Sequence, residues 1–240
     1  MKKYITIILL TFIAVILYIT VYRITEQDNL NSPTYIYHTS LYLENSYIET
    51  GMKNIVEAIT INYRSIDTIG GIMILLTSIV SVSSLLRGSM KDVVETEIVF
   101  EDVILKTVVR ALVPLCFVFA FYTFLIGDVS PGGGFQSGLV FAATIITMGF
   151  AYGCKFMQNK FLFKIQMLII SISFLTIMSI GLIGPFLGLN LFSYYFPETT
   201  GYPEAKIMRL IITKIFSFCI ALIVGMSASS LFYVMTGEDS

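Results

Sequence analysis

The sequence predicts an all-α integral membrane protein with six transmembrane helices. Of its 240 residues, 56 % are hydrophobic and only 13 % are charged, whereas soluble domains carry about 25 % charged residues. The mean hydropathy is +0.83, and the apolar residues gather in long runs. Because about 20 consecutive apolar residues can cross a bilayer as one helix, these observations exclude a soluble globular domain.

Six runs reach this length. The expected spans cover residues 4–22, 66–86, 103–126, 135–153, 163–187 and 208–235. The first follows Lys2 and Lys3, as a signal peptide would, but its apolar stretch is too long and no small-residue cleavage site follows it. We therefore expect a retained anchor, followed by a polar, aromatic loop over residues 23–65.

The distribution of Lys and Arg predicts the orientation in the membrane. The connections expected on the inner side hold Lys2, Lys3, Arg87, Lys91, Lys155 and Lys160. Cytoplasmic connections carry an excess of such residues. We expect a multi-pass protein of the plasma membrane, with both termini in the cytoplasm and the connector after the third span on the outer face.

Four residues within or beside the spans are candidates for an ion path or a subunit contact. Lys106 and Arg110 lie four apart on one face of the third span, where they either extend to the membrane interface or pair with a carboxylate of a neighbouring subunit. Pro114 removes a backbone hydrogen bond from the same span. Asp67 begins the second span, where a carboxylate also suits a helix N-terminus.

The sequence offers little sign of a catalytic, cofactor or metal site. The three cysteines form no C-x-x-C pair, and the single histidine is His38. No Asp or Glu lies deep within any of the six runs, although a chain that moves protons or sodium ions by itself is expected to have such groups. The pattern predicts a part of a transporter that needs no cofactor and is not its transporting core.

The connector between the third and fourth spans is the most distinctive segment. About eight residues reverse the chain, and three successive glycines give the backbone access to positive φ. We expect valine at Gly133 to be worse than alanine. The connector is either a tight turn or a contact for an ion or subunit, and its candidate residues are Pro131, Gly132, Gly133, Gly134, Phe135 and Gln136.

Two segments together carry a resemblance to a known family. In residues 103–115 an Arg precedes a Pro by four positions, and sixteen residues separate that Pro from Pro-Gly-Gly-Gly-Phe-Gln-Ser-Gly in residues 130–138. This string resembles the B subunit of Mrp-type multisubunit Na⁺/H⁺ antiporters and the related subunit of membrane-bound hydrogenases and sulfane reductases. The resemblance covers roughly residues 100–237.

The N-terminal part has a likeness of its own. Residues 54–70 are similar to the C-terminal extension of the large A subunit of Mrp antiporters, with matches at Asn54, Val56, Arg64, Asp67 and Thr68. The resemblance implies a two-helix module in residues 1–90, a charged linker in residues 91–102 and a B-type four-helix domain in residues 103–240.

The chain departs from the family pattern at three places. Gly71 stands where relatives usually carry Glu, and Gly127-Asp128 stands where many B subunits have His. An acidic group is common early in the last helix, and Lys214 is the nearest charge here.

The resemblance implies a non-redox membrane subunit of a multisubunit Na⁺/H⁺ antiporter complex rather than an enzyme. Such a subunit would contribute to assembly and is a candidate for part of the ion path. One alternative is an antiporter-module subunit of a hydrogenase or sulfane reductase complex, and another is a purely structural scaffold. The implied partners are other subunits, the lipid bilayer, and Na⁺ and H⁺ as transported ions, with no nucleic acid.

Overall fold

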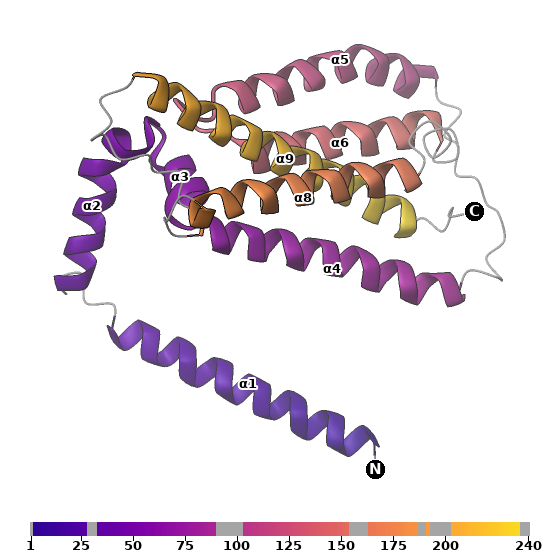
Figure 1. Ribbon diagram of the computed structural model, residues 1–240. Coiled ribbons are helices and arrows are strands. Elements are labelled where there is room, and N and C mark those ends of the chain that lie inside the picture. Colours follow the sequence, from indigo (N-terminus) through magenta and orange to yellow (C-terminus); the bar gives the residue numbers. More distant parts are fainter. Residues whose placement is uncertain are drawn as a thin grey trace. The chain divides into compact units, whose positions relative to one another are not determined.

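The computed structural model describes residues 2–27, 33–89, 103–153, 163–186, 191–192 and 203–235. Every regular element within these ranges is helical (Figure 1), which confirms the predicted all-α class. The expected linker at residues 91–102 lies outside the described residues. By its internal contacts the chain divides into two units, Met1–Asn45 and Ser46–Ser240.

The first unit contains α1 (Lys2–Gln27) and most of α2 (Pro33–Thr50). The apolar stretch Leu9–Tyr22 of α1 is exposed around its circumference, as in a helix surrounded by lipid. The prediction of a loop over residues 23–65 is wrong where α2 forms. Pro33 suits the first position of a helix, because the missing N–H has no intrahelical partner there.

Five further helices are long and apolar enough to cross a membrane, in agreement with the predicted spans. They are α4 (Ser65–Ser89), α5 (Val103–Leu125), α6 (Gly134–Tyr152), α8 (Phe163–Phe186) and α9 (Pro203–Met235). The chain is therefore a multi-pass membrane protein of about six spans.

Helix α9 is the centre of the second unit, where it packs against α4, α5, α6 and α8. Phe216, Ile223 and Val224 of α9 are fully buried. Helix α6 runs parallel to α9, because Gly134 lies beside Ser217 and Gly138 lies beside Ala221. These two glycines, four residues apart, let the two backbones approach closely in the way that small residues do in membrane bundles.

A short bent segment precedes α4. Helix α3 (Ile55–Ala58) continues into η1 (Ile59–Tyr63), a π-helical turn in which the N–H of Arg64 donates to the carbonyl of Ile59 at 2.7 Å. The hydroxyl of Thr68 donates to the carbonyl of Thr60 at 2.7 Å, which links η1 to the start of α4. Single π turns often occur at functional sites, and this one positions α3 beside the spanning helices.

Candidate functional site

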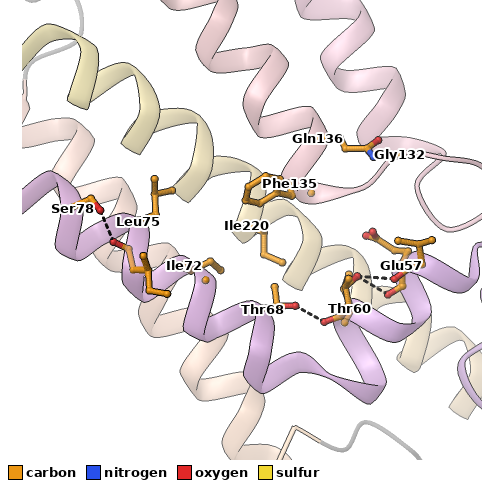
Figure 2. Close-up of a pocket in the computed structure, with 15 residues that line it drawn as sticks. Glu57, Thr60, Thr68, Ile72, Leu75, Ser78, Gly132, Phe135, Gln136 and Ile220 are labelled. Carbon is orange, nitrogen blue, oxygen red and sulfur yellow. Dashed lines mark hydrogen bonds between the residues drawn. The ribbon is translucent and has the colours of Figure 1, made fainter. Parts of the chain in front are cut away.

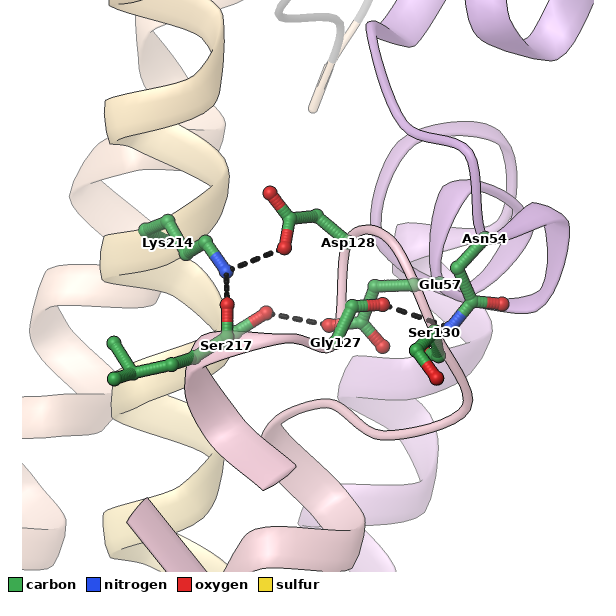
Figure 3. A network of polar contacts seen from close by, with 8 residues as sticks. Asn54, Glu57, Gly127, Asp128, Ser130, Lys214 and Ser217 are labelled. Atoms are coloured by element: carbon green, nitrogen blue, oxygen red, sulfur yellow. Dashed lines mark hydrogen bonds and ion pairs between the residues drawn. The ribbon is translucent and has the colours of Figure 1, made fainter. Parts of the chain in front are cut away.

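A buried carboxylate, Glu57, lies at the centre of the polar contacts in the second unit (Figure 3). It belongs to the four-residue helix α3 and is only 8 % exposed. The hydroxyl of Ser217 donates to its Oε1 at 2.6 Å, and the backbone N–H of Gly134 also donates to the carboxylate. Ser217 lies nine residues into the apolar part of α9, Met208–Met235, which corresponds to about 14 Å of helix.

The position of Glu57 changes one inference from the sequence. The six apolar runs do lack deep carboxylates, but a segment outside the spans places a buried carboxylate against the helix bundle, beside the start of α6. Sequence reasoning placed Glu57 in a loop and missed it. A signal was present, because Asn54 followed by Glu three positions later is typical of a helix N-terminus.

Burial is the main influence on the acidity of Glu57. Removal from water disfavours the charged carboxylate and raises its pKa above the ordinary value. The hydrogen bond from Ser217, the positive charge of Lys214 and the N–H of Gly134 each act to lower the pKa, while the negative charge of Asp128 acts to raise it. Burial outweighs the opposing influences, so Glu57 holds its proton to higher pH than an exposed glutamate.

Two of the three connector glycines leave room for close neighbours, one for this carboxylate and one for α9. Gly133 has φ +116° and immediately precedes α6, and a Cβ built there would lie 2.6 Å from Cδ of Glu57 and overlap a carboxylate oxygen. A Cβ at Gly134 would overlap the carbonyl of Ser217. The glycines therefore do more than reverse the chain, because they make room for Glu57 and for α9.

Asn54 fastens the connector to α3. Its side-chain Nδ2 donates to the carbonyls of Gly127 at 2.7 Å and Ser130 at 2.9 Å. Its Oδ1 accepts from the N–H of Val56 at 3.2 Å and so caps α3. The backbone N–H of Asn54 donates to the carbonyl of Asp128 at 2.9 Å. One side chain thus joins two segments more than 70 residues apart in the sequence.

An ion pair connects the connector with α9. Nζ of Lys214 lies 2.8 Å from Oδ1 of Asp128, and it also donates to the carbonyl of Leu125 at 2.5 Å. The two charged side chains are 31 % and 24 % exposed, respectively. Asp128 and Lys214 are two of the departures from the family pattern, and the structure places them in direct contact.

A cavity of about 580 Å³ lies beside Glu57, as Figure 2 shows. Its walls come from α3, η1, α4, the connector, α6 and α9, and most of its lining is apolar. Its polar side chains are Glu57, Thr60, Thr68, Ser78 and Gln136. Gly71, the third departure from the family pattern, lines the same cavity and has open space where a Cβ would be.

The predicted site residues fall into separate places. Gly132, Gly134, Phe135 and Gln136 line the cavity beside Glu57. Pro131 is exposed in the same connector. On α5, Lys106 is half-buried, and Arg110 and Pro114 are exposed; none of these three lines the cavity.

Asp67 lies apart from this network. Its carboxylate accepts from Nε of Arg64 at 2.5 Å and is 59 % exposed. Among the residues that the structure describes, no three His, Cys, Asp or Glu are grouped so as to bind a metal ion. At the polar network, the Glu57 carboxylate can bind and release a proton next to the ion pair of Asp128 and Lys214.

Comparison with known proteins assigns the chain to a family. Residues 104–230 match the family model described as a domain related to the MnhB subunit of Na⁺/H⁺ antiporters. The chain belongs to this family. Residues 5–95 match the MbhE family model, which describes a subunit of MBH, so the MnhB-related domain is fused to an MbhE-like module.

Curated relatives match a short part of the MnhB-related domain. A putative antiporter subunit mnhB2 of Staphylococcus saprophyticus is 46 % identical over 54 residues, and that of Staphylococcus aureus strain Newman is 41 % identical over 54 residues. These matches cover 22 % of this chain and 38 % of each relative. The chain thus spans well under half the length of the curated relatives that it matches.

Two solved structures share the fold over nearly the whole chain. A chain of the membrane-bound sulfane sulfur reductase, an archaeal respiratory membrane complex, is 25 % identical with a TM-score of 0.66, covering 95 % of this chain and 98 % of its own. A chain of the Mrp complex from Dietzia is 20 % identical with a TM-score of 0.65, covering 96 % of this chain and 26 % of its own. The MnhB-related domain and the MbhE-like module therefore have counterparts in two kinds of membrane complex.

Proposed function

We propose that this chain is a non-redox membrane subunit of a multisubunit Na⁺/H⁺ antiporter complex. In this role it joins other subunits of the complex in the plasma membrane and contributes to assembly and to the ion path. Its MnhB-related domain and its likeness to chains of two multisubunit complexes support the proposal.

The observation that carries the proposal is the junction between the two modules. Asn54 and Glu57 belong to the MbhE-like part, and their partners Gly127, Ser130 and Ser217 belong to the MnhB-related domain. These hydrogen bonds join the last part of the MbhE-like module, residues 54–57, to the MnhB-related domain. We assign residues 1–90 to the first module, 91–102 to a linker and 103–240 to the second.

Helix α5 is the most suitable surface for a neighbouring subunit. It is the least buried of the five qualifying helices, with only 11 % of its apolar window covered by this chain. Lys106 and Arg110 lie on it as candidate partners for a carboxylate of another subunit. A cationic side chain in a spanning helix is stabilised by such pairing.

Purification of a tagged chain from its native membrane tests the proposal. The expected result is a stable complex with antiporter-like subunits. Vesicles that contain this complex should exchange Na⁺ for H⁺, while liposomes that contain the chain alone should show no exchange. Recovery of the chain without partners under conditions that preserve other membrane complexes would contradict it.

The alternative of a redox-driven complex has a specific observation in its favour, the match over 98 % of a chain of the sulfane sulfur reductase complex. Metal analysis of the purified complex decides between the two. Stoichiometric iron or nickel favours the redox-driven alternative, and their absence from the intact complex favours a stand-alone antiporter.

We also propose that both termini are cytoplasmic and that the connector faces outward. Val129 is 59 % exposed within the connector and is a suitable reporter. A Val129→Cys variant is expected to react with a membrane-impermeant maleimide added to intact cells. Labelling only after the cells are permeabilised would instead place the connector on the cytoplasmic side and contradict the proposed orientation.

A further inference from the structure

Four polar side chains are buried in the helix bundle at the end of α9 that lies away from Glu57. They are Ser83 of α4, Gln166 of α8, and Ser227 and Ser230 of α9. In the described part of the chain, their three hydroxyls and the Nε2 of Gln166 have no hydrogen-bond partner. A buried polar group without a partner is costly, so such groups indicate a bound ligand or water.

The four side chains end a buried seam that is otherwise largely apolar. The seam is formed by the facing sides of α4, α8 and α9, which pack against one another around α9. Its apolar part consists of Ile72 and Ile79 of α4, Ile170 and Ile177 of α8, and Phe216, Ile220 and Ile223 of α9. The buried faces of all three helices thus become polar at the same end.

Contacts farther along α8 and α9 place Gln166 and Ser230 at one level. The N–H of Phe192 donates to the carbonyl of Gly181 at 3.1 Å, and the Phe192 ring lies edge-on to Phe216 at 6.5 Å between centroids. Gln166 lies fifteen residues before Gly181, and Ser230 lies fourteen residues after Phe216, which corresponds to about 22 and 21 Å of helix. Because α8 and α9 run in opposite directions (Figure 1), the two side chains reach the same level.

Ser83 reaches this level from α4. Ile72 of α4 and Ile220 of α9 line the same cavity, and these two helices run in the same direction (Figure 1). Ser83 lies eleven residues after Ile72, and Ser230 lies ten residues after Ile220, which corresponds to about 16 and 15 Å of helix. Three helices therefore bring unpaired polar groups to one place.

The chemistry of these groups favours water as the ligand. The side-chain nitrogen of Gln166 can only donate, whereas each serine hydroxyl can donate and accept. A water molecule also donates and accepts, and buried water typically makes about three hydrogen bonds to groups of this kind. The four side chains carry no charge that could offset the dehydration of a bound ion.

We propose that bound water occupies the polar end of this seam and joins α4 to α8 and α9 through Ser83, Gln166 and Ser230. Ser83 belongs to the MbhE-like module, and the other two belong to the MnhB-related domain. The water is a second junction between the modules, about 20 Å along α9 from the hydrogen bond of Ser217 to Glu57. This inference is independent of the transport activity of the complex.

Radiolytic hydroxyl-radical labelling of the full chain in lipid nanodiscs tests the proposal, because radicals formed from bound water oxidise the side chains beside it. Met226 lies one helical turn before Ser230 and is 5 % exposed. The expected result is oxidation of Met226, which is lost in a Gln166→Leu, Ser230→Ala double variant. Met178 packs against the apolar cluster and should stay unmodified in both chains. An unmodified Met226 in the wild type, or equal oxidation in both chains, would overturn the proposal.

The melting temperature gives a second test, in which the sign of the change decides. Ser230→Ala should lower the melting temperature, because it removes a hydrogen bond to the bound water. A hydroxyl without any partner would make the alanine variant more stable, and that result would overturn the proposal. Ser229→Ala is the matched control and should have a smaller effect, since Ser229 is equally buried but donates to the carbonyl of Gly225 in its own helix at 2.9 Å.

The two tests together separate bound water from direct contacts between the side chains. A lower melting temperature of Ser230→Ala without oxidation of Met226 would indicate a direct hydrogen bond and overturn the proposal. Neither measurement requires partner subunits, so its failure is distinct from failure of the proposed complex.

Discussion

Two carboxylates ten residues apart have opposite surroundings in this protein. Asp67 opens a spanning helix, is 59 % exposed and pairs with Arg64. Glu57 lies on a short helix outside the spans, yet it is 8 % exposed and accepts a hydrogen bond from Ser217 of the central helix α9. The comparison shows that the burial of an ionisable group depends on tertiary packing and cannot be read from the distance to the nearest apolar run.

The bend between the two residues produces this difference. The π-helical turn η1 ends at Tyr63 and is followed by Arg64, whose φ of −125° and ψ of 37° are not helical. Residues before the bend pack against the connector and α9, and residues after it begin α4. A polar segment therefore turns inward, while the start of an apolar helix remains at the surface.

The largest expected effect comes from filling the space that Glu57 occupies. Gly133→Ala should strongly lower accumulation of the folded chain, because its Cβ would displace the Glu57 carboxylate from its hydrogen bonds and would strain a backbone position with φ +116°. The sequence alone predicts that valine is worse than alanine, but here the first carbon atom already collides. Abundance of the chain in membranes measures the effect.

A matched control and a second-site change sharpen this prediction. Gly71→Ala should be well tolerated, since nothing lies within 4 Å of a Cβ at that position. Adding Glu57→Ala to Gly133→Ala should restore part of the abundance by removing the colliding carboxylate. Normal abundance of Gly133→Ala alone would show that Glu57 does not occupy this position.

The next effect concerns the attachment of the connector to α3. Asn54→Ala removes two hydrogen bonds to connector carbonyls and one helix cap, and should lower the free energy of unfolding by about 2–4 kcal/mol. Thermal unfolding in detergent measures it. Asn62→Ala is the control, because within the described part of the chain the side chain of Asn62 donates only a long contact to the sulfur of Met52 at 3.9 Å. An equal loss in both variants would refute the role of Asn54.

A smaller effect depends on pH and separates the two carboxylates. The raised pKa of Glu57 means that folding favours its protonated form. The associated stability is fully present below the unfolded pKa, about 4.5, and is lost as pH rises through the folded value. Glu57→Gln should therefore become more stable relative to the wild type as pH increases, as measured by melting temperature.

Asp67→Asn provides the comparison for this pH series. Surface ion pairs contribute about 0–1 kcal/mol, so this variant should differ little from the wild type in melting temperature. A stability difference for Glu57→Gln that stays constant across the series would contradict a raised pKa at Glu57.

The spanning helices and the connector could be predicted because each depends on residues that are consecutive in the sequence. Apolar runs of about 20 residues have few alternatives to a membrane helix. Helix α5 ends at Leu125 and helix α6 begins at Gly134, each about one residue from the expected position. The helix α2 was not predicted, because its polar and aromatic residues lack a clear apolar period.

The network around Glu57 could not be predicted for a different reason. It joins residues 54–57, 125–134 and 214–217, and no local pattern indicates that these three segments meet. The sequence drew attention to Asp67, whose neighbours in the chain match a family pattern. The roles of Asp67, Lys106 and Arg110 in the ion path stay predictions.

The most direct test compares Glu57→Gln with Asp67→Asn in Na⁺/H⁺ exchange by the complete complex. Exchange is measured in membrane vesicles and normalised to the amount of intact complex. The account predicts normal assembly of both variants, loss of most exchange in Glu57→Gln and a smaller reduction in Asp67→Asn. Full exchange by Glu57→Gln at equal complex abundance would contradict it.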